Sequence, residues 1–331
     1  MILSNTPVRI AFGGGGTDVE PYSSDNGGFV VNATINKYFM TKLDFNLENI
    51  IKVYKDDVLL YNLDVTHEIS VNSDLIKAIL YYLSIKEGID ISFHGDPPKK
   101  AGLGASASLS CALIAGILKL QENEIDKNEV AEMAFQVEDK VLKNAGGRQD
   151  QYAAVHGGFN CLEFQGNSRV KIEKLTIQSS FKLELEKRLI LYYTGQEHVS
   201  GDLVKDQIEF YEKRKEKSKS YLDRLKEIAY SIKDAIISED LESFGLLLQK
   251  DLEVKRLFNP RLMTEFMNSL NKGMIKRGAI GGRVCGAGGG GCMIWLIKDF
   301  DKNAIIDYLN QQPGFLIDYE FVESGLELKK L

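Results

Sequence analysis

A strand, a glycine-rich loop and a helix follow one another directly in the middle of this chain. Residues 89–95 (IDISFHG) predict the strand, and the loop PPKKAGLG comes next. The run of small and then aliphatic residues that follows predicts a helix beginning near Ala105. Gly102 and Gly104 permit backbone conformations that a side chain would forbid, so loop amides can approach a ligand closely. Because the N–H groups and positive dipole end of the helix point at the same place, the unit predicts a phosphate-binding site.

Two other interpretations of the glycine segments were weighed. The loop before Ala105 could be only a tight turn with serine caps, and it is no Walker A loop because no Gly-Lys-Ser/Thr follows at the required spacing. The segment GGGGTD near the N-terminus could suggest a dinucleotide fingerprint. That fold needs a helix directly after the glycines, whereas Pro21 and the pair at 27–28 break the chain there.

The remaining pattern predicts an α+β protein with two domains. A chain of 331 residues is longer than most chains that fold around a single hydrophobic core. The expected strands and helices also do not alternate strictly. The periodicity changes near residue 181, so we expect domains at 1–181 and 182–331 with the ligand between them. Expected strands are 7–12, further strands within 28–44, 188–195, 282–285, 292–297 and 314–322; expected helices are 73–88, 126–143, a long charged region after 200 reaching about 277, and one from 301.

Charge and cysteine content narrow the function classes. The formal net charge of -6 argues against nucleic acid, which needs a dense basic surface. The four cysteines lack metal-ligand spacing and are expected to be reduced, buried thiols. No signal peptide is recognisable and no apolar run reaches the ~20 residues of a membrane span. We therefore expect a cytoplasmic protein that binds a small ligand and no membrane.

Three segments together resemble the motifs of the GHMP kinase family. TPVRIAFGGGGTD resembles the first motif, PKKAGLGASAS the second and GAIGGRVCGAGGGGCMIWL the third, in the same order over residues 7–297. Ala105 replaces the first of two serines in the second motif. Gly14, Gly15 and Gly16 stand where mevalonate-type and galactose-type members carry Gly-Glu-His.

The resemblance implies a fold and a chemistry. It implies an N-terminal α+β domain with a left-handed crossover, a C-terminal ferredoxin-like domain, and transfer of phosphate from ATP with Mg2+. Asp150 falls at the family's catalytic Asp and Arg9 at a basic residue of the first motif. Glu138 and Ser106 match the metal ligands. Taken singly, Asp150 could be a turn residue, Glu138 a solvated charge and Arg9 a partner in a salt bridge.

The resemblance also implies which residues bind the ligands. The resemblance assigns ATP binding to the second motif, namely Lys100, Ala101, Gly102, Leu103, Gly104, Ala105, Ser106, Ala107 and Ser108. Asp18 is a natural acceptor for sugar hydroxyls, because a carboxylate can take two hydrogen bonds. The expected substrate-binding set is Gly15, Gly16, Thr17, Asp18, Asp150, Lys255, Arg256, Gly288 and Gly289.

The first motif also indicates a branch of the family. GGGTDVEPYSSDNGG and RQDQYAAVHGG resemble the members that phosphorylate D-glycero-D-manno-heptose 7-phosphate at its anomeric hydroxyl, for nucleotide-activated heptose and surface polysaccharide synthesis, and relatives that act on fucose-like sugars. A distal phosphate requires cations, and we expect Lys255 and Arg256 before His198, Lys205 or Arg283. The alternatives are a kinase for an unphosphorylated sugar such as fucose or galactose, and a non-catalytic sensor of the same fold. A homodimer is compatible with the sequence.

Overall fold

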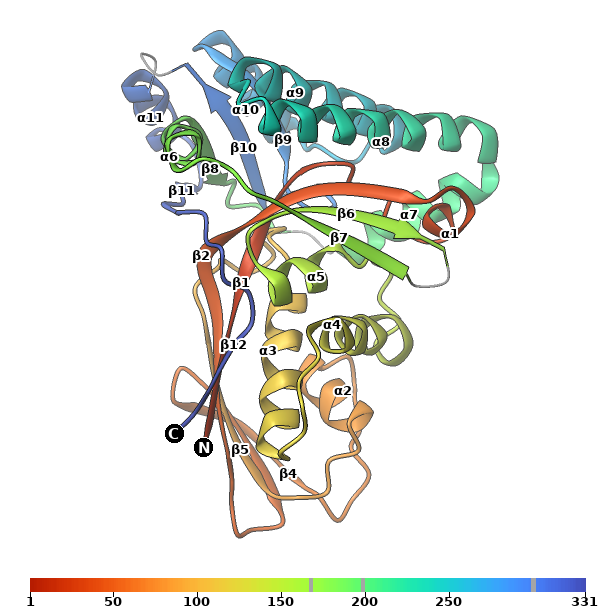
Figure 1. Cartoon of the computed structure of the whole chain (residues 1–331), viewed down its shortest axis with the longest axis vertical. Coiled ribbons are helices and arrows are strands. Elements are labelled where there is room, and N and C mark those ends of the chain that lie inside the picture. The colour runs from red at the N-terminus through yellow and green to blue at the C-terminus, as the bar shows by residue number, and fades with distance from the viewer. Residues whose placement is uncertain (167–168, 198–199, 299–301) are drawn as a thin grey trace.

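Two sheets and the helices around them make up the molecule (Figure 1). The computed structural model describes residues 1–166, 169–197, 200–298 and 302–331. The expected α+β class is confirmed. In the described ranges, no helix has the length and apolar character that crossing a membrane requires.

The first sheet has eight strands, six of them in the order β12-β1-β2-β5-β3-β4, and β6 joins β2 to β7. Neighbours are antiparallel except for the parallel pair β3 and β5. Long β2 pairs with β6 through its first half and with β5 through its second. The strands are β1 (Ile2–Gly13), β2 (Gly28–Phe45), β3 (Ile50–Lys55), β4 (Val58–Asp64), β5 (Ile89–Gly95), β6 (Phe159–Gln165), β7 (Arg169–Leu175) and β12 (Glu327–Lys330).

Strand β1 shows how the sheet is covered. Ile2 and Ser4 are buried while Leu3 and Asn5 are half-exposed, the alternation of a sheet with one solvated face. From Thr6 onward every residue is buried, because helices cover both faces there. On one face, α3 (Ala105–Leu120) and α5 (Gln149–His156) contact β1 and β2 directly, and α2 (Leu75–Tyr82) and α4 (Lys127–Gln136) pack on α3. The short α1 (Tyr22–Asn26) contacts β6 and β2.

Buried hydroxyls fix α3 against β1. Ser4 Oγ donates to the Ala112 carbonyl at 2.6 Å, and Thr6 Oγ1 donates to the Ser108 carbonyl at 2.7 Å. These bonds satisfy polar atoms that would otherwise be costly to bury. Since α3 begins directly after the glycine loop, they also fix the position of that loop.

The second sheet is antiparallel and has the order β11-β8-β10-β9. Numbered along the chain this is 4-1-3-2, the order of a ferredoxin-like domain. Its strands are β8 (Leu189–Tyr193), β9 (Ala279–Val284), β10 (Cys292–Ile297) and the short β11 (Phe315–Leu316). Its helices are α6 (Ser179–Arg188), α7 (Ser200–Lys213), α8 (Lys215–Ile237), α9 (Leu241–Phe258), α10 (Glu265–Lys276) and α11 (Lys302–Asn310).

Several elements differ from the sequence prediction, and β3, β4, β6 and β7 were not among the expected strands. The helix expected over 126–143 is α4 followed by a π-helical segment, Val137–Val141. The strand expected over 314–322 shrinks to β11, after which the chain leaves the second sheet. It returns as β12 to pair with β1, from Ile2 opposite Lys330 to Asn5 opposite Glu327, so both termini lie together at the base of the first sheet (Figure 1).

That return modifies the expected division at 181. Residue 181 lies inside α6, and the last strand of the chain belongs to the first sheet. The physical reason is that β12 covers an edge of β1 that would otherwise expose unpaired backbone groups. The range 182–331 therefore contributes strands to both sheets.

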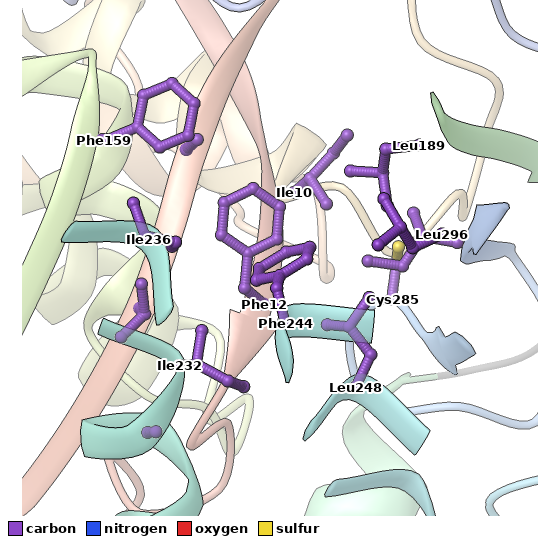
Figure 2. Close-up of a cluster of buried hydrophobic side chains, with 14 of the residues drawn as sticks. Ile10, Phe12, Phe159, Leu189, Ile232, Ile236, Phe244, Leu248, Cys285 and Leu296 are labelled. Carbon is purple, nitrogen blue, oxygen red and sulfur yellow. The ribbon is translucent and has the colours of Figure 1, made fainter. Parts of the chain in front are cut away.

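A single cluster of apolar side chains joins the two halves. Phe12 of β1 contacts Phe244 of α9 edge to face, with ring centroids 5.3 Å apart, and Phe159 and Phe321 at 6.0 Å. Figure 2 shows the rings of Phe12, Phe159 and Phe244 beside aliphatic side chains of α8, β8 and β10. The two halves of the molecule therefore share one hydrophobic core.

A substitution in this cluster tests the shared core. Phe12→Ala should lower the free energy of unfolding by about 3 to 5 kcal/mol, because it opens a cavity among aromatic rings. Trp295, the one tryptophan of the chain, is buried in β10 of the second half. In the Phe12→Ala variant, the urea midpoint measured by Trp295 fluorescence should fall by as much as the midpoint measured by far-UV circular dichroism.

The matched control is Leu246→Ala, since Leu246 lies on α9 but is 56% exposed. It should change stability by less than about 0.5 kcal/mol. A Phe12→Ala variant whose Trp295 transition stays at the wild-type urea concentration would mean that the halves unfold independently.

Candidate active site between the two halves

A cavity of about 410 Å³ lies between the halves. Its wall comes from the loop after β1, the glycine loop before α3, the π-helical segment, the first turn of α5, and side chains of α7, α9 and β9. Segments far apart in the sequence therefore meet there, as the two-domain prediction requires.

The glycine loop is anchored by both sheets. The Arg9 backbone N–H donates to the Leu103 carbonyl at 3.0 Å, and the Cys292 N–H donates to the Ala101 carbonyl at 2.8 Å. Gly102 and Gly104 have φ of 74° and 79°, which side chains adopt only with strain. A Cβ on Gly102 would lie 2.7 Å from the Cys285 carbonyl oxygen. The loop is thus held where the first N–H groups of α3 face the cavity.

Most of the segment expected to bind ATP lines the cavity. Lys100, Ala101, Gly102, Gly104, Ala105, Ser106 and Ala107 do so. Leu103 and Ser108 do not, because Leu103 is packed in the core and Ser108 bonds to Thr6. Lys100 is exposed and lies 3.2 Å from Glu197.

Arg9 and Asp150 form an ion pair beside this loop. Both Nε and NH2 of Arg9 donate to Asp150 Oδ1, at 2.8 and 2.7 Å, and NH1 donates to the Gly102 carbonyl at 2.6 Å. Asp150 Oδ2 faces Gly104, where a Cβ would lie 3.2 Å from it. Because the Arg9 side chain is only 4% exposed, this pair is held firmly. It leaves one carboxylate oxygen directed toward the start of α3.

Ser106 and Glu138 lie in hydrogen-bond contact on the same side of the loop. Glu138 also accepts a bond from Gln151 Nε2 at 2.8 Å. Burial, with a smaller contribution from Asp150, raises the pKa of Glu138 to about 7. A hydroxyl and a carboxylate are hard oxygen ligands, and so small a set suits Mg2+, which completes its coordination with water and phosphate oxygens. No cluster of three or more His, Cys, Asp or Glu side chains occurs among the described residues to hold a metal entirely by protein.

Asp18 is buried at the end of the loop after β1. Its Oδ1 accepts the Gly16 N–H at 3.0 Å and its Oδ2 accepts Gln149 Nε2 at 3.2 Å. Burial raises its pKa above the usual range. Thr17 turns the other way, donating through Oγ1 to the Gly14 carbonyl at 2.8 Å, so it supports the loop and does not line the cavity.

Two cations of the second half reach the cavity. Lys255 Nζ donates to the Gly286 carbonyl at 3.0 Å, and burial followed by the charge of Arg283 lowers its pKa to about 8. Arg283 is 1% exposed and lies 3.3 Å from Asp251. Five residues of the expected substrate-binding set line the cavity, namely Gly15, Gly16, Asp18, Asp150 and Lys255, whereas Thr17, Arg256, Gly288 and Gly289 do not.

The remaining cation candidates are elsewhere. Arg256 is exposed because it follows Lys255 on α9 and faces solvent, and Lys205 is exposed on α7. His198 lies outside the described residues. Gly289 donates its N–H to the Leu262 carbonyl at 2.7 Å, a bond within the second half.

Sequence reasoning missed Gln149, Asp251 and Gln207, and ranked Arg283 low. Gln207 of α7 donates to the Gly16 carbonyl at 2.9 Å and lines the cavity. Only one signal was available: Asp251 precedes Lys255 by four residues, the spacing that places side chains on one helix face. Gln149 stands in the same motif as Asp150, but nothing in the motif shows where its amide points.

The first turn of α5 organises the site. Gln149 contacts Asp18, Asp150 contacts Arg9, and Gln151 contacts Glu138. Three successive residues thus reach the loop after β1, the glycine loop and the π-helical segment. The arrangement can bind a polyphosphate, a divalent cation and a polyhydroxylated ligand next to a firmly held carboxylate.

Comparisons with known proteins agree with this chemistry. The model for the GHMP kinases N terminal domain matches residues 73–158, and that for GHMP kinases C terminal matches residues 232–314. The D-glycero-alpha-D-manno-heptose 7-phosphate kinase of Campylobacter jejuni is 30% identical over 98% of both chains. The bifunctional fucokinase/GDP-fucose pyrophosphorylase of Arabidopsis thaliana is 24% identical over 89% of this chain and 30% of its own length. The solved D-glycero-D-manno-heptose 1-phosphate kinase of Bacteroides thetaiotaomicron is 25% identical, with a TM-score of 0.83 and 100% and 99% coverage.

The raised pKa of Glu138 makes cation binding depend on pH. A metal ion needs the ionised carboxylate, so protons compete with Mg2+ below about pH 7. Lowering the pH from 8 to 6 should weaken the apparent Mg2+ affinity by about tenfold, as the ionised fraction falls. The measurement is a Mg2+ titration of the binding of a non-hydrolysable ATP analogue.

Glu138→Gln is the control at each pH, because it retains the shape but cannot ionise. Its Mg2+ affinity should be weaker at pH 8, and its remaining pH dependence reports the nucleotide alone. Equal Mg2+ titrations for the variant and the wild type at pH 8 would remove Glu138 from the cation site.

Proposed function

Since the chain belongs to the GHMP kinases, we propose that this ATP-dependent sugar kinase phosphorylates the anomeric hydroxyl of D-glycero-D-manno-heptose 7-phosphate, giving the 1,7-bisphosphate. The observation that carries the proposal is the Arg9–Asp150 pair beside the glycine loop. It offers a carboxylate oxygen at the point where an acceptor hydroxyl must meet a phosphate.

Asp150 is the proposed catalytic residue. Its Oδ2 accepts the hydrogen bond of the anomeric hydroxyl, orients the oxygen toward the γ-phosphorus and takes its proton as the new P–O bond forms and the bond to the departing ADP breaks. Arg9 holds Oδ1 and the loop carbonyl, so the carboxylate keeps one orientation. Its positive charge also partly neutralises the charge that develops on the transferring group.

The nucleotide is proposed to lie along the glycine loop. N–H groups at the start of α3 bind its phosphate oxygens, and the positive end of the helix favours their charge. Ser106 and Glu138 would hold Mg2+, whose positive charge would offset that of the phosphates. Lys100, in the same loop, also lines the cavity.

The sugar is proposed to lie against the loop after β1. Asp18 accepts hydrogen bonds from its hydroxyls, and the Gln149 amide keeps the Asp18 carboxylate oriented. Gln207 closes this side by bonding to Gly16. The acceptor and the nucleotide then meet at Asp150, which lies next to Gln149 in the chain.

A kinase for fucose is the second candidate. Its support is the similarity to a bifunctional fucokinase and to an L-fucokinase/L-fucose-1-P guanylyltransferase of Bacteroides fragilis, 25% identical over 90% of this chain and 35% of its own length. An ATP-consumption assay across heptose 7-phosphate, mannose, fucose and galactose separates the two. Turnover of fucose above that of heptose 7-phosphate would replace the first candidate.

Asp150→Asn tests the catalytic proposal. The amide keeps the shape and can still contact Arg9 through its oxygen, but it cannot accept the hydroxyl proton. Turnover should fall by on the order of 100-fold or more, while binding of an ATP analogue changes little, because the lost interaction belongs to the transition state. Steady-state kinetics and calorimetry measure the two quantities.

The control is Asp57→Asn, since Asp57 is exposed between β3 and β4 with φ of 62°, a conformation that asparagine tolerates. It should leave both quantities unchanged. Turnover of Asp150→Asn within threefold of the wild type would exclude Asp150 as the catalytic base.

A further inference from the structure

Three nitrogen donors converge on one point above Gly15. A Cβ built on Gly15 would have as its nearest neighbours Gln149 Nε2 and Lys255 Nζ, both at 3.6 Å, and Arg283 NH2 at 3.8 Å. These side chains come from α5, α9 and β9, and each lines the cavity. Glycine at residue 15 leaves the point open, so a ligand can occupy it.

Each donor has capacity beyond its contacts in the protein. Lys255 Nζ carries three N–H groups and gives one to Gly286; the Gln149 amide carries two and gives one to Asp18. Arg283 NH1 is buried without a hydrogen-bond partner in the part of the chain that the structure describes. Unused donors in a buried position are costly unless a ligand accepts from them.

The charges around this point favour an anion. Lys255 and Arg283 are buried cations that repel each other, and Arg283 is among the causes that lower the pKa of Lys255. Asp251 contacts Arg283 at 3.3 Å, but its other oxygen accepts the Gly14 N–H at 3.1 Å. Asp251 and Asp18 offset part of the charge of Lys255, whereas Arg283 and Arg9 repel it, and a bound dianion would relieve that repulsion.

We propose that Gln149, Lys255 and Arg283 form a subsite above Gly15 for a phosphate monoester, the one that the acceptor sugar carries. A phosphate monoester has three terminal oxygens, enough for one charge-assisted bond from each cation and one from the amide. This assignment rests on the proposed function, and it names Arg283 as the partner of Lys255 in place of exposed Arg256.

The same chemistry could come from a nucleotide phosphate, but the position favours the acceptor. Gln149 bonds to Asp18, the residue proposed to hold sugar hydroxyls, whereas its neighbour Asp150 serves the glycine loop. The backbone N–H groups of that loop and the Ser106–Glu138 pair already provide for the phosphates of ATP. A phosphate above Gly15 therefore belongs to a ligand that contacts Asp18.

Gly15→Ala is the sharpest test. It fills the point with a methyl group and leaves all charges in place, and the space and backbone allow it because φ of Gly15 is outside the left-handed region. Calorimetry without nucleotide would compare heptose 7-phosphate with the same heptose lacking phosphate. Wild type should bind the phosphorylated sugar at least tenfold more tightly, and Gly15→Ala should lose most of that preference with little change for the plain heptose.

A second variant removes the cation itself. Arg283→Met is combined with Asp251→Asn so that no carboxylate is left buried alone, and the pair should also lose the preference. Arg256→Met is the matched control, because it deletes a neighbouring charge of α9 that faces solvent, and it should keep the preference.

The outcomes separate the two proposals. A preference retained in both Gly15→Ala and the Arg283 variant overturns the subsite while leaving the substrate proposal standing. Weaker binding of a non-hydrolysable ATP analogue, with the sugar preference retained, assigns the site to the nucleotide and likewise overturns it. A wild type that binds both sugars equally overturns the heptose 7-phosphate proposal and the subsite with it.

Discussion

The buried guanidinium of Arg9 is the contact on which the rest of the site depends. It joins β1, the glycine loop and the first turn of α5, since its three nitrogens bond to Gly102 and Asp150 while its backbone bonds to Leu103. A planar group with fixed donor directions can hold a carboxylate and a carbonyl in one relative geometry. The orientation of Asp150 is therefore set by contacts within the protein.

The surrounding fold keeps this geometry from relaxing. The Phe12 cluster makes the two halves share a core, and β12 pairs with the first residues of β1, the strand that carries Arg9 farther along. Around the cavity, burial changes the charge balance in opposite directions: the pKa of Glu138 rises and that of Lys255 falls. Both groups gain from an oppositely charged ligand, because a cation or an anion offsets the burial that disfavours their charged forms. A desolvated site of this kind discriminates by charge as well as by shape.

Much of the fold follows from patterns that the sequence carries locally. The strand over 89–95 and the helix that begins at Ala105 lie where the glycine loop and the apolar periodicity predicted them. The strand predicted over 314–322 was too long, because the short β11 and the later β12 depend on which edge of a distant sheet is open. The domain boundary near 181 stays a prediction. Edge pairing is a non-local contact, and no spacing within 314–331 encodes its partner.

The sequence by itself determined which residues could carry the chemistry. Its three glycine segments resemble the motifs of the GHMP kinases in order, and that resemblance assigned the phosphate-binding loop, Glu138 and Ser106 as expected cation ligands and Asp150 as the candidate base. Only the tertiary structure decided which side chains meet. Lys255 faces the cavity while adjacent Arg256 faces solvent. Gln149 and Arg283 converge above Gly15 although they lie more than 130 residues apart in the chain. Such convergence depends on the packing of α5, α9 and β9 around one core, and a position along the chain does not specify it.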